Sequence, residues 1–245
     1  MKCLNCNETH HEPTAKFCHV CGNKLNKKNG LCKDKPYQYS SSKPSEGVCA
    51  GHKWVDLGLP SGLKWATCNI GASEPSDYGD YFAWSETSPK SEYGTVMKYR
   101  KWGFLTSVLS KYCLSKDGYD WRGEGSPDNK TCLDDADDAA RSNWGAGWRM
   151  PTKAEFCELR TNCRFERTVL DGINGHMVYS KKNDNCIFLP AAGFREYSSL
   201  DKAGVHGYYW SSSLGDRSNH ALGLWNARLF NFDRGCGFPV RPVIE

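Results

Sequence analysis

The sequence lacks a long apolar run. None of its segments approaches the roughly 18 consecutive apolar residues that a membrane-spanning helix needs. The first residues, 1–6, also lack the apolar segment of a secretory signal. We therefore expect a cytoplasmic protein that has no membrane partner.

An excess of charge of one sign is also missing from most of the chain. The formal net charge is +4, and residues 1–35 account for it with seven Lys against three acidic residues. The remaining residues are balanced, so they show no basic signature for nucleic acid. Glycine (24 residues) and proline (11 residues) are too few and too scattered for a collagen-like or disordered chain. The length of 245 residues, 39% of them hydrophobic, suits one domain with a small module.

Cysteine, by contrast, is abundant, and four of the thirteen cysteines are regularly spaced. Two C-x2-C pairs at this separation can place four thiolates tetrahedrally around one zinc ion. All four ligands would come from the protein, so the zinc would be structural and would leave no position open for catalysis. A module of about 25 residues buries too little surface to fold unaided, so the metal would supply its stability. The predicted ligands are Cys3, Cys6, Cys18 and Cys21.

We predict a zinc ribbon over residues 1–26, since residues 16–25 also resemble the second half of bacterial zinc ribbons. A redox pair or two disulfides are the alternatives. The histidines nearby are expected at the surface and not at the metal: His10, His11 and His19.

The other nine cysteines have no compact spacing. We expect free thiols in a reducing compartment, most of them small buried hydrophobes. A Cys49–Cys68 or Cys157–Cys163 disulfide would require an oxidising location. The nine are Cys32, Cys49, Cys68, Cys113, Cys132, Cys157, Cys163, Cys186 and Cys236.

Composition changes near residue 50. Residues 27–50 are polar and contain Ser40-Ser41-Ser42, which predicts a flexible linker. Residues 51–245 read as one α+β domain with two helices, short antiparallel strands and long loops. The strands are expected at 53–57, 63–68, 186–190, 207–212, 221–230 and 237–243.

Two segments carry helical signals. At 152–162, Thr152 and Glu155 fit a capping box, and Phe156 and Leu159 give an apolar face. At 131–143, acidic residues crowd the early turns, where the helix dipole favours them. We expect a solvated helix start there, although clustered carboxylates could hold a hard cation instead. These acids are Asp134, Asp135, Asp137 and Asp138.

Ordered motifs over about 53–243 resemble the Fibrobacter succinogenes major paralogous domain, a family abundant in Bacteroidetes. The first is the stretch from Trp54 to Ala66. The others are Gly79–Glu86, Asp137–Ala140, Trp148–Thr152, Ile187–Gly193, Tyr209–Ser213 and Val240–Val243.

This resemblance implies a C-type-lectin-like fold close to the formylglycine-generating enzymes. It also implies a possible role for the chain, because some members of the family are variable proteins of diversity-generating retroelements. In those systems, adenines near the 3′ end of the coding region are randomised.

Residues 203–244 lack four residue types. They contain no Lys, Glu, Gln or Met, although these types make up 37 residues of the whole chain. AAC codons randomised at adenine encode none of the four, and they cannot encode Trp, so Trp210 and Trp225 would be framework residues. A β-rich, Gly-rich end that disfavours long side chains is the plainer explanation.

The variable region is expected at about 207–238, between the framework motifs. Outward side chains there could change at little cost in stability, as in a paratope. We expect Tyr208 at the surface and Phe230 in the core, whereas Phe232 could take either place. The predicted ligand-binding positions are Tyr208, Gly215, Asp216, Arg217, Ser218, Asn219, His220, Arg228, Phe232, Asp233, Gly235 and Cys236.

The sequence gives little support for a specific catalytic activity or for calcium-dependent sugar binding. Calcium-dependent sugar binding is not expected, since Trp225-Asn226-Ala227 lacks the Asp ligand of lectins. No cysteine pair matches the formylglycine-generating enzymes, so the resemblance transfers fold and not activity. No Ser/His/Asp motif or phosphate loop is present. The histidines His176, His206 and His220 are isolated.

These observations predict a non-enzymatic binding protein whose ligand is a macromolecule, a protein in the first instance. The zinc ribbon would recruit another protein or, through Lys24, Lys27 and Lys28, nucleic acid. The alternatives are a formylglycine-generating-like oxidase that acts on protein cysteine, and an invariant structural module with a fixed partner.

Overall fold

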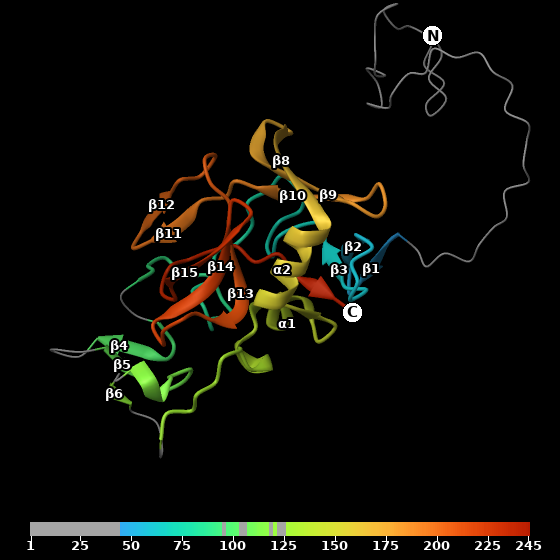
Figure 1. Cartoon of the computed structure of the whole chain (residues 1–245). Coiled ribbons are helices and arrows are strands. Elements are labelled where there is room, and N and C mark those ends of the chain that lie inside the picture. Colours follow the sequence, from blue (N-terminus) through green and yellow to red (C-terminus); the bar gives the residue numbers. More distant parts are fainter. Residues whose placement is uncertain (1–44, 95–96, 103–106, 118–119, 122–125) are drawn as a thin grey trace, which may run out of the picture. The chain divides into compact units, whose positions relative to one another are not determined.

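The computed structural model describes residues 45–94, 97–102, 107–117, 120–121 and 126–245 (Figure 1). The predicted zinc ribbon, with Cys3, Cys6, Cys18 and Cys21, lies outside the described residues, as does the linker up to residue 44. The end of the linker prediction is wrong, because β1 (Glu46–Cys49) pairs with β2 (His52–Asp56). Within these ranges, no helix has the length and apolarity to cross a bilayer.

A five-stranded sheet joins the two ends of the described fold. Its order is β1-β2-β3-β16-β7, with β3 (Lys64–Ala66), β7 (Trp148–Arg149) and β16 (Val243–Ile244). The last strand lies between β3 and β7, and Val243 is opposite Trp65. The strand predicted at 237–243 is wrong over most of its length. Its backbone makes isolated bridges instead, between Phe238 and Phe82 and between Gly237 and Arg195.

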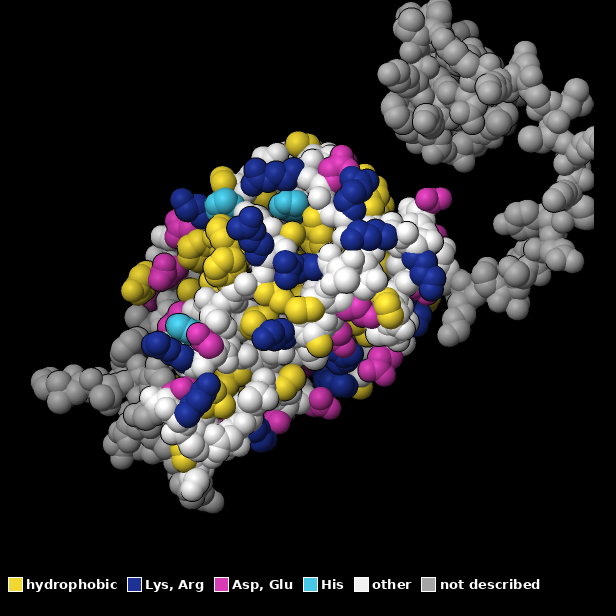
Figure 2. Space-filling view, in the orientation of Figure 1, with side chains coloured by type: hydrophobic (Ala, Val, Ile, Leu, Met, Phe, Trp, Pro, Cys, Tyr) yellow, Lys and Arg dark blue, Asp and Glu magenta, His cyan; other side chains and the backbone are white. Residues whose placement is uncertain are grey.

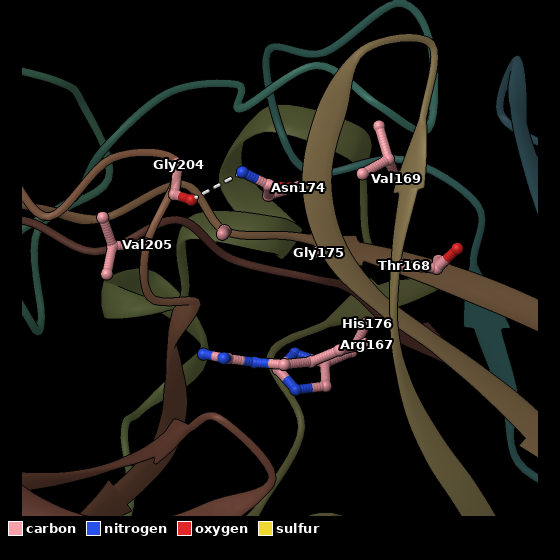
Figure 3. Close-up of a pocket in the computed structure, with 9 residues that line it drawn as sticks. Arg167, Thr168, Val169, Asn174, Gly175, His176, Gly204 and Val205 are labelled. Atoms are coloured by element: carbon pink, nitrogen blue, oxygen red, sulfur yellow. Dashed lines mark hydrogen bonds between the residues drawn. The ribbon is translucent and has the colours of Figure 1, made fainter.

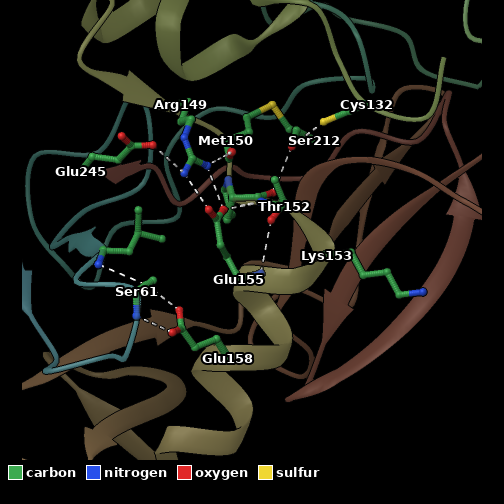
Figure 4. Close-up of polar contacts among 12 residues, drawn as sticks. Ser61, Cys132, Arg149, Met150, Thr152, Lys153, Glu155, Glu158, Ser212 and Glu245 are labelled. Carbon is green, nitrogen blue, oxygen red and sulfur yellow. Dashed lines mark hydrogen bonds and ion pairs between the residues drawn. The ribbon is translucent and has the colours of Figure 1, made fainter.

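The described residues contain two α-helices, which confirms an α+β architecture: α1 (Ala139–Trp144) and α2 (Lys153–Asn162). The capping box of α2 is confirmed. Thr152 Oγ1 accepts from the Glu155 amide at 3.3 Å, and the Glu155 carboxylate accepts from the Thr152 amide at 2.7 Å (Figure 4). Arg149 holds the same carboxylate through two hydrogen bonds of 2.8 and 2.6 Å. Phe156 and Leu159 are fully buried, as the apolar face predicted.

The acidic run before α1 is not a solvated helix start. A 3-10 turn, η2 (Asp135–Asp137), precedes the α-helix, which starts later than predicted because Asp138 caps it. Asp138 also accepts a hydrogen bond from the Met150 amide. Asp137 is 1% exposed and binds Lys98 at 2.7 Å and Lys111 at 2.6 Å. These ammonium groups compensate its charge.

Four further groups of strands complete the described fold. The strands β8 (Cys163–Leu170), β9 (Ile173–Ser180) and β10 (Cys186–Pro190) form one antiparallel sheet, and β11 (Phe194–Glu196) pairs with β12 (Ser199–Asp201). A third sheet has the order β13-β14-β15, with β13 (Tyr208–Leu214), β14 (His220–Trp225) and β15 (Arg228–Asp233). A small sheet combines β4 (Arg100–Trp102), β5 (Ser107–Leu109) and β6 (Asp120–Trp121), with η1 (Ser115–Asp117) beside it in sequence.

Two of the sequence motifs contain a residue whose surroundings explain its identity. Arg241 is fully buried and donates to the carbonyls of Ala66 and Thr67 and to the Asn69 side chain. It thereby ties the C-terminal motif to the segment after β3. Gly79 has a φ of +72°, and a Cβ there would collide with the Ile70 carbonyl, so only glycine fits. The eight described cysteines are free thiols.

Candidate ligand-binding surface

The C-terminal sheet carries most of the predicted ligand-binding positions. It consists of β13 (Tyr208–Leu214), β14 (His220–Trp225) and β15 (Arg228–Asp233). Asn226 and Ala227 form the turn between β14 and β15, with φ of 43° and 65°. Positive φ at both central residues matches the right-handed twist of a two-residue hairpin. The strand predicted over 221–230 is therefore wrong as one element, because it bends back at this turn.

Neighbouring groups hold this turn in place. The Asn226 side chain accepts from the Gly207 amide at 3.0 Å and lies 2.7 Å from the His206 Nδ1 atom. Arg160 of α2 donates to the Ala227 carbonyl at 2.6 Å. The hairpin tip is thus fixed by contacts with the two residues before β13 and with α2.

One face of the sheet is aromatic. The register places Trp225 opposite Arg228, Gly223 opposite Phe230 and Ala221 opposite Phe232, so these side chains share a face. We use the term aromatic surface for six residues whose rings form a continuous set of contacts: Phe194, His206, Tyr208, Trp225, Phe230 and Phe232.

Exposure increases outward across this surface. Trp210 and Phe238 stack 4.1 Å apart beneath it and are 0% and 1% exposed. Phe232 packs on Phe238 at 5.0 Å and is half-buried, whereas Phe230 on the outer strand is 44% exposed. Figure 2 shows hydrophobic side chains reaching the surface between basic ones on the face in view. Because the inner rings are packed, the outer ones have a rigid base.

Two of the aromatic predictions are wrong. Tyr208 is buried at 9% exposure, because Phe194, Phe232 and Phe238 surround its ring. Phe230 was expected in the core, but it points away from it on the outer strand of the sheet. The period of two in Arg228-Leu229-Phe230-Asn231-Phe232 could have indicated that Phe230 and Arg228 face the same way.

The twelve predicted positions fall into three groups. Asp216, Arg217 and Arg228 are exposed. Three are buried: Tyr208, Ser218 and Gly235. The other six are half-buried: Gly215, Asn219, His220, Phe232, Asp233 and Cys236.

Three of the positions are held by their surroundings. Ser218 is fully buried; its hydroxyl donates to Asp117 at 2.6 Å and accepts from the Leu114 amide at 2.7 Å. A Cβ at Gly215 would approach Asn231 Oδ1 to 2.7 Å, and one at Gly235 would approach the Gly94 carbonyl to 2.9 Å. Neither glycine can accept a side chain without a shift of its neighbours.

Charged groups flank the aromatic surface. Asp233 forms an ion pair with the buried Arg100 at 2.8 Å. Asp216 lies 3.1 Å from His220 Nδ1, and this hydrogen bond lowers the pKa of the Asp216 carboxyl. Burial raises the pKa of the Cys236 thiol to about 12, so this group is protonated at neutral pH.

Metal ligands do not gather in the described part of the chain, where no three His, Cys, Asp or Glu side chains could hold an ion together. At the position of the lectin-like Trp225-Asn226-Ala227, the Asn226 amide already contacts His206 and Gly207. The exposed ring of Phe230 and the exposed polar side chains near it are suited to contact with a surface. The chain matches no family model, no curated protein and no solved structure.

Proposed function

We propose that this chain is a non-enzymatic binding protein that holds a macromolecular ligand, a protein, against its aromatic surface. The observation that carries the proposal is Phe230, which is 44% exposed while it packs edge-on against Trp225 at 5.2 Å. A large aromatic side chain fixed by its neighbours loses little entropy on binding and is typical of interface hot spots.

Polar groups around the rings support the same function. Arg228 is exposed opposite Trp225 and lies on the same face of β15 as Phe230. Arg217 and Asp216 are exposed in the connection between β13 and β14. Such a polar rim supplies hydrogen bonds and charge complementarity, whereas the aromatic centre supplies most of the affinity.

The resemblance to retroelement variable proteins suggests how the ligand is chosen. Side chains that change from copy to copy must leave the fold intact, so we place them among the outward positions. The proposed variable set keeps the predicted positions that are neither buried nor too crowded for a side chain, and it adds Phe230 and Asn231. Tyr208, Gly215, Ser218 and Gly235 become framework residues, and the set is Asp216, Arg217, Asn219, His220, Arg228, Phe230, Asn231, Phe232, Asp233 and Cys236.

Sequencing the coding region from many cells of the source population tests the diversification. Substitutions should concentrate in the codons of this set, while those of Trp210, Trp225 and Ser218 stay constant. An adjacent reverse-transcriptase gene and a near-copy of the 3′ coding end should accompany them. An invariant segment over 208–238 would contradict diversification and would favour the alternative of one fixed partner.

A matched pair of double variants tests the binding surface itself. Proteins captured by the full chain are identified, and their affinities for the chain are measured with purified components. Phe230→Ala with Arg228→Ala should weaken binding at least about tenfold, because a hot-spot ring and a rim charge are lost. The control combines Val48→Ala with Arg164→Ala, two exposed residues far from the sheet in sequence, and should bind as the wild type does. Equal loss in both variants would contradict the assignment.

The zinc ribbon predicted for residues 1–26 is proposed as an accessory interaction module. It would bring the binding domain to a second protein or to nucleic acid. Its metal would stabilise the module and take no part in chemistry.

A further inference from the structure

A cavity of about 380 Å³ lies between the β8–β9 hairpin and the segment at Gly204 and Val205 (Figure 3). Its volume falls in the range of small-molecule sites, roughly 300–1,000 Å³. The Asn174 side chain donates to the Gly204 carbonyl at 3.0 Å and links the two sides. None of the described lining residues is acidic.

Two nitrogen-bearing side chains face each other across the hairpin. Arg167 on β8 and His176 on β9 are directly opposite in the register. Figure 3 shows the Arg167 guanidinium alongside the His176 ring at the cavity. Neither side chain has a hydrogen bond or an ion pair with another described residue.

Arg164 on the same strand is a useful contrast. Its guanidinium pairs with Glu166 and lies over the Tyr179 ring at 4.6 Å from the centroid. The charge of Arg164 is therefore compensated, whereas the charge of Arg167 has no acidic counterpart among the described residues. A guanidinium without a carboxylate, at the wall of a cavity, is suited to a planar oxyanion.

The surroundings of His176 favour the same kind of ligand. Burial, and then the positive charge of Arg167, lower the pKa of His176. Its partner on β10 is the uncharged Leu189, and Val205 across the cavity is uncharged as well. A neutral imidazole keeps one N–H to donate. An anion held beside the ring would favour the imidazolium and reverse the shift.

We propose that this cavity binds a small organic anion, a carboxylate or a phosphate monoester on a short apolar body. Arg167 forms a bidentate pair with the anionic group, and His176 donates a further hydrogen bond. Val169, Ala191 and Val205 contact the apolar body. None of the lining residues belongs to the aromatic surface, so the inference does not depend on the proposed function.

The test follows the His176 ring signals in spectra of the isotope-labelled full chain. The probes are benzoate, phenyl phosphate, acetate and inorganic phosphate, at ionic strength held constant with sodium chloride. Neutral benzamide serves as the matched control ligand. Benzoate or phenyl phosphate should shift the His176 signals saturably and raise the pKa of His176. Acetate and inorganic phosphate should bind more weakly, because they leave the apolar wall uncovered. Benzamide should cause no saturable shift.

Two variants complete the experiment. Arg167→Gln should weaken the binding of the aryl anions about tenfold or more, since it removes a charge-assisted bidentate pair. Arg164→Gln removes the same charge from the same strand and should keep the wild-type affinity. The proposal is overturned if no aryl anion gives a saturable shift, if benzamide binds as well as benzoate, or if the two variants behave alike.

Discussion

At the scale of single residues, Asp137 is the most consequential charge in the described fold. Its carboxylate is 1% exposed and receives hydrogen bonds from Lys98, Lys111, Tyr99 and Tyr112. Asp137→Asn removes the acidic partner of Lys98 and leaves Lys111 with Asp134 alone, at 2.7 Å. We expect a loss of about 2–4 kcal/mol in the free energy of unfolding, less than for a fully buried pair because both lysines reach solvent. Urea unfolding at neutral pH measures it.

The same carboxylate makes stability depend on pH. Burial alone would raise its pKa, but the hydrogen bonds from Lys111 and Lys98 outweigh burial and hold the pKa at about 2, below the ordinary 3.8. A lowered folded pKa means that the contribution is present above the unfolded pKa and is lost as the pH falls from about 4 to about 2. Asp137→Asn should therefore flatten the pH profile in this interval. A profile that falls as steeply in Asp137→Asn as in the wild type would contradict this assignment.

Tyr208 and Phe230 should respond to truncation in opposite ways. Tyr208→Ala removes a ring packed among Phe194, Phe232 and Phe238 and should cost about 3–5 kcal/mol of stability. Phe230→Ala removes a ring that is 44% exposed and should cost about 1 kcal/mol. Denaturant unfolding followed by tryptophan fluorescence compares the two variants. A larger loss for Phe230→Ala would refute the orientation of β15.

At the scale of elements, local signals were predictable and distant contacts were not. The start of α2 follows from Thr152 and Glu155, because a capping box depends on residues three apart. The bend at Asn226-Ala227 was missed, since Ala at the second turn position gives no signal where glycine would. The burial of Tyr208 depends on Phe194 and Phe238, which lie far from it in sequence. The outward direction of Phe230 could have been predicted, because side chains alternate between the two faces along β15.

The β14–β15 turn leads to an element-level prediction. Ala227 adopts φ of 65°, a conformation that an L-residue reaches only with strain. Ala227→Gly should relieve it and raise the free energy of unfolding by about 0.5–1 kcal/mol, with a rise of about 2 °C in Tm. Thermal unfolding measures the change. Ala146→Gly is the control: Ala146 is exposed with φ outside the positive region, so glycine there should lower stability slightly. A lower Tm for Ala227→Gly would count against the turn geometry.

At the scale of the whole molecule, the sequence divides into parts that can be followed separately. All nine tryptophans lie between Trp54 and Trp225, so their fluorescence reports on this part of the chain alone. The described domain has its own core, centred on residues such as Trp65, Trp84 and Trp210. The C-terminal strand β16 pairs with β3 and with β7 and thereby joins the two halves of the first sheet.

This division gives the last prediction. The purified full chain should hold one zinc ion, measured by elemental mass spectrometry, because four thiolates complete a tetrahedral site. Cys18→Ser with Cys21→Ser should abolish zinc binding, while the denaturant midpoint of the tryptophan signal stays unchanged. The control is Cys68→Ser with Cys186→Ser, two free and half-buried thiols of the described domain, which should keep the zinc. Zinc retained after the loss of Cys18 and Cys21 would place the metal elsewhere. A shifted tryptophan midpoint would show that the two parts do not fold independently.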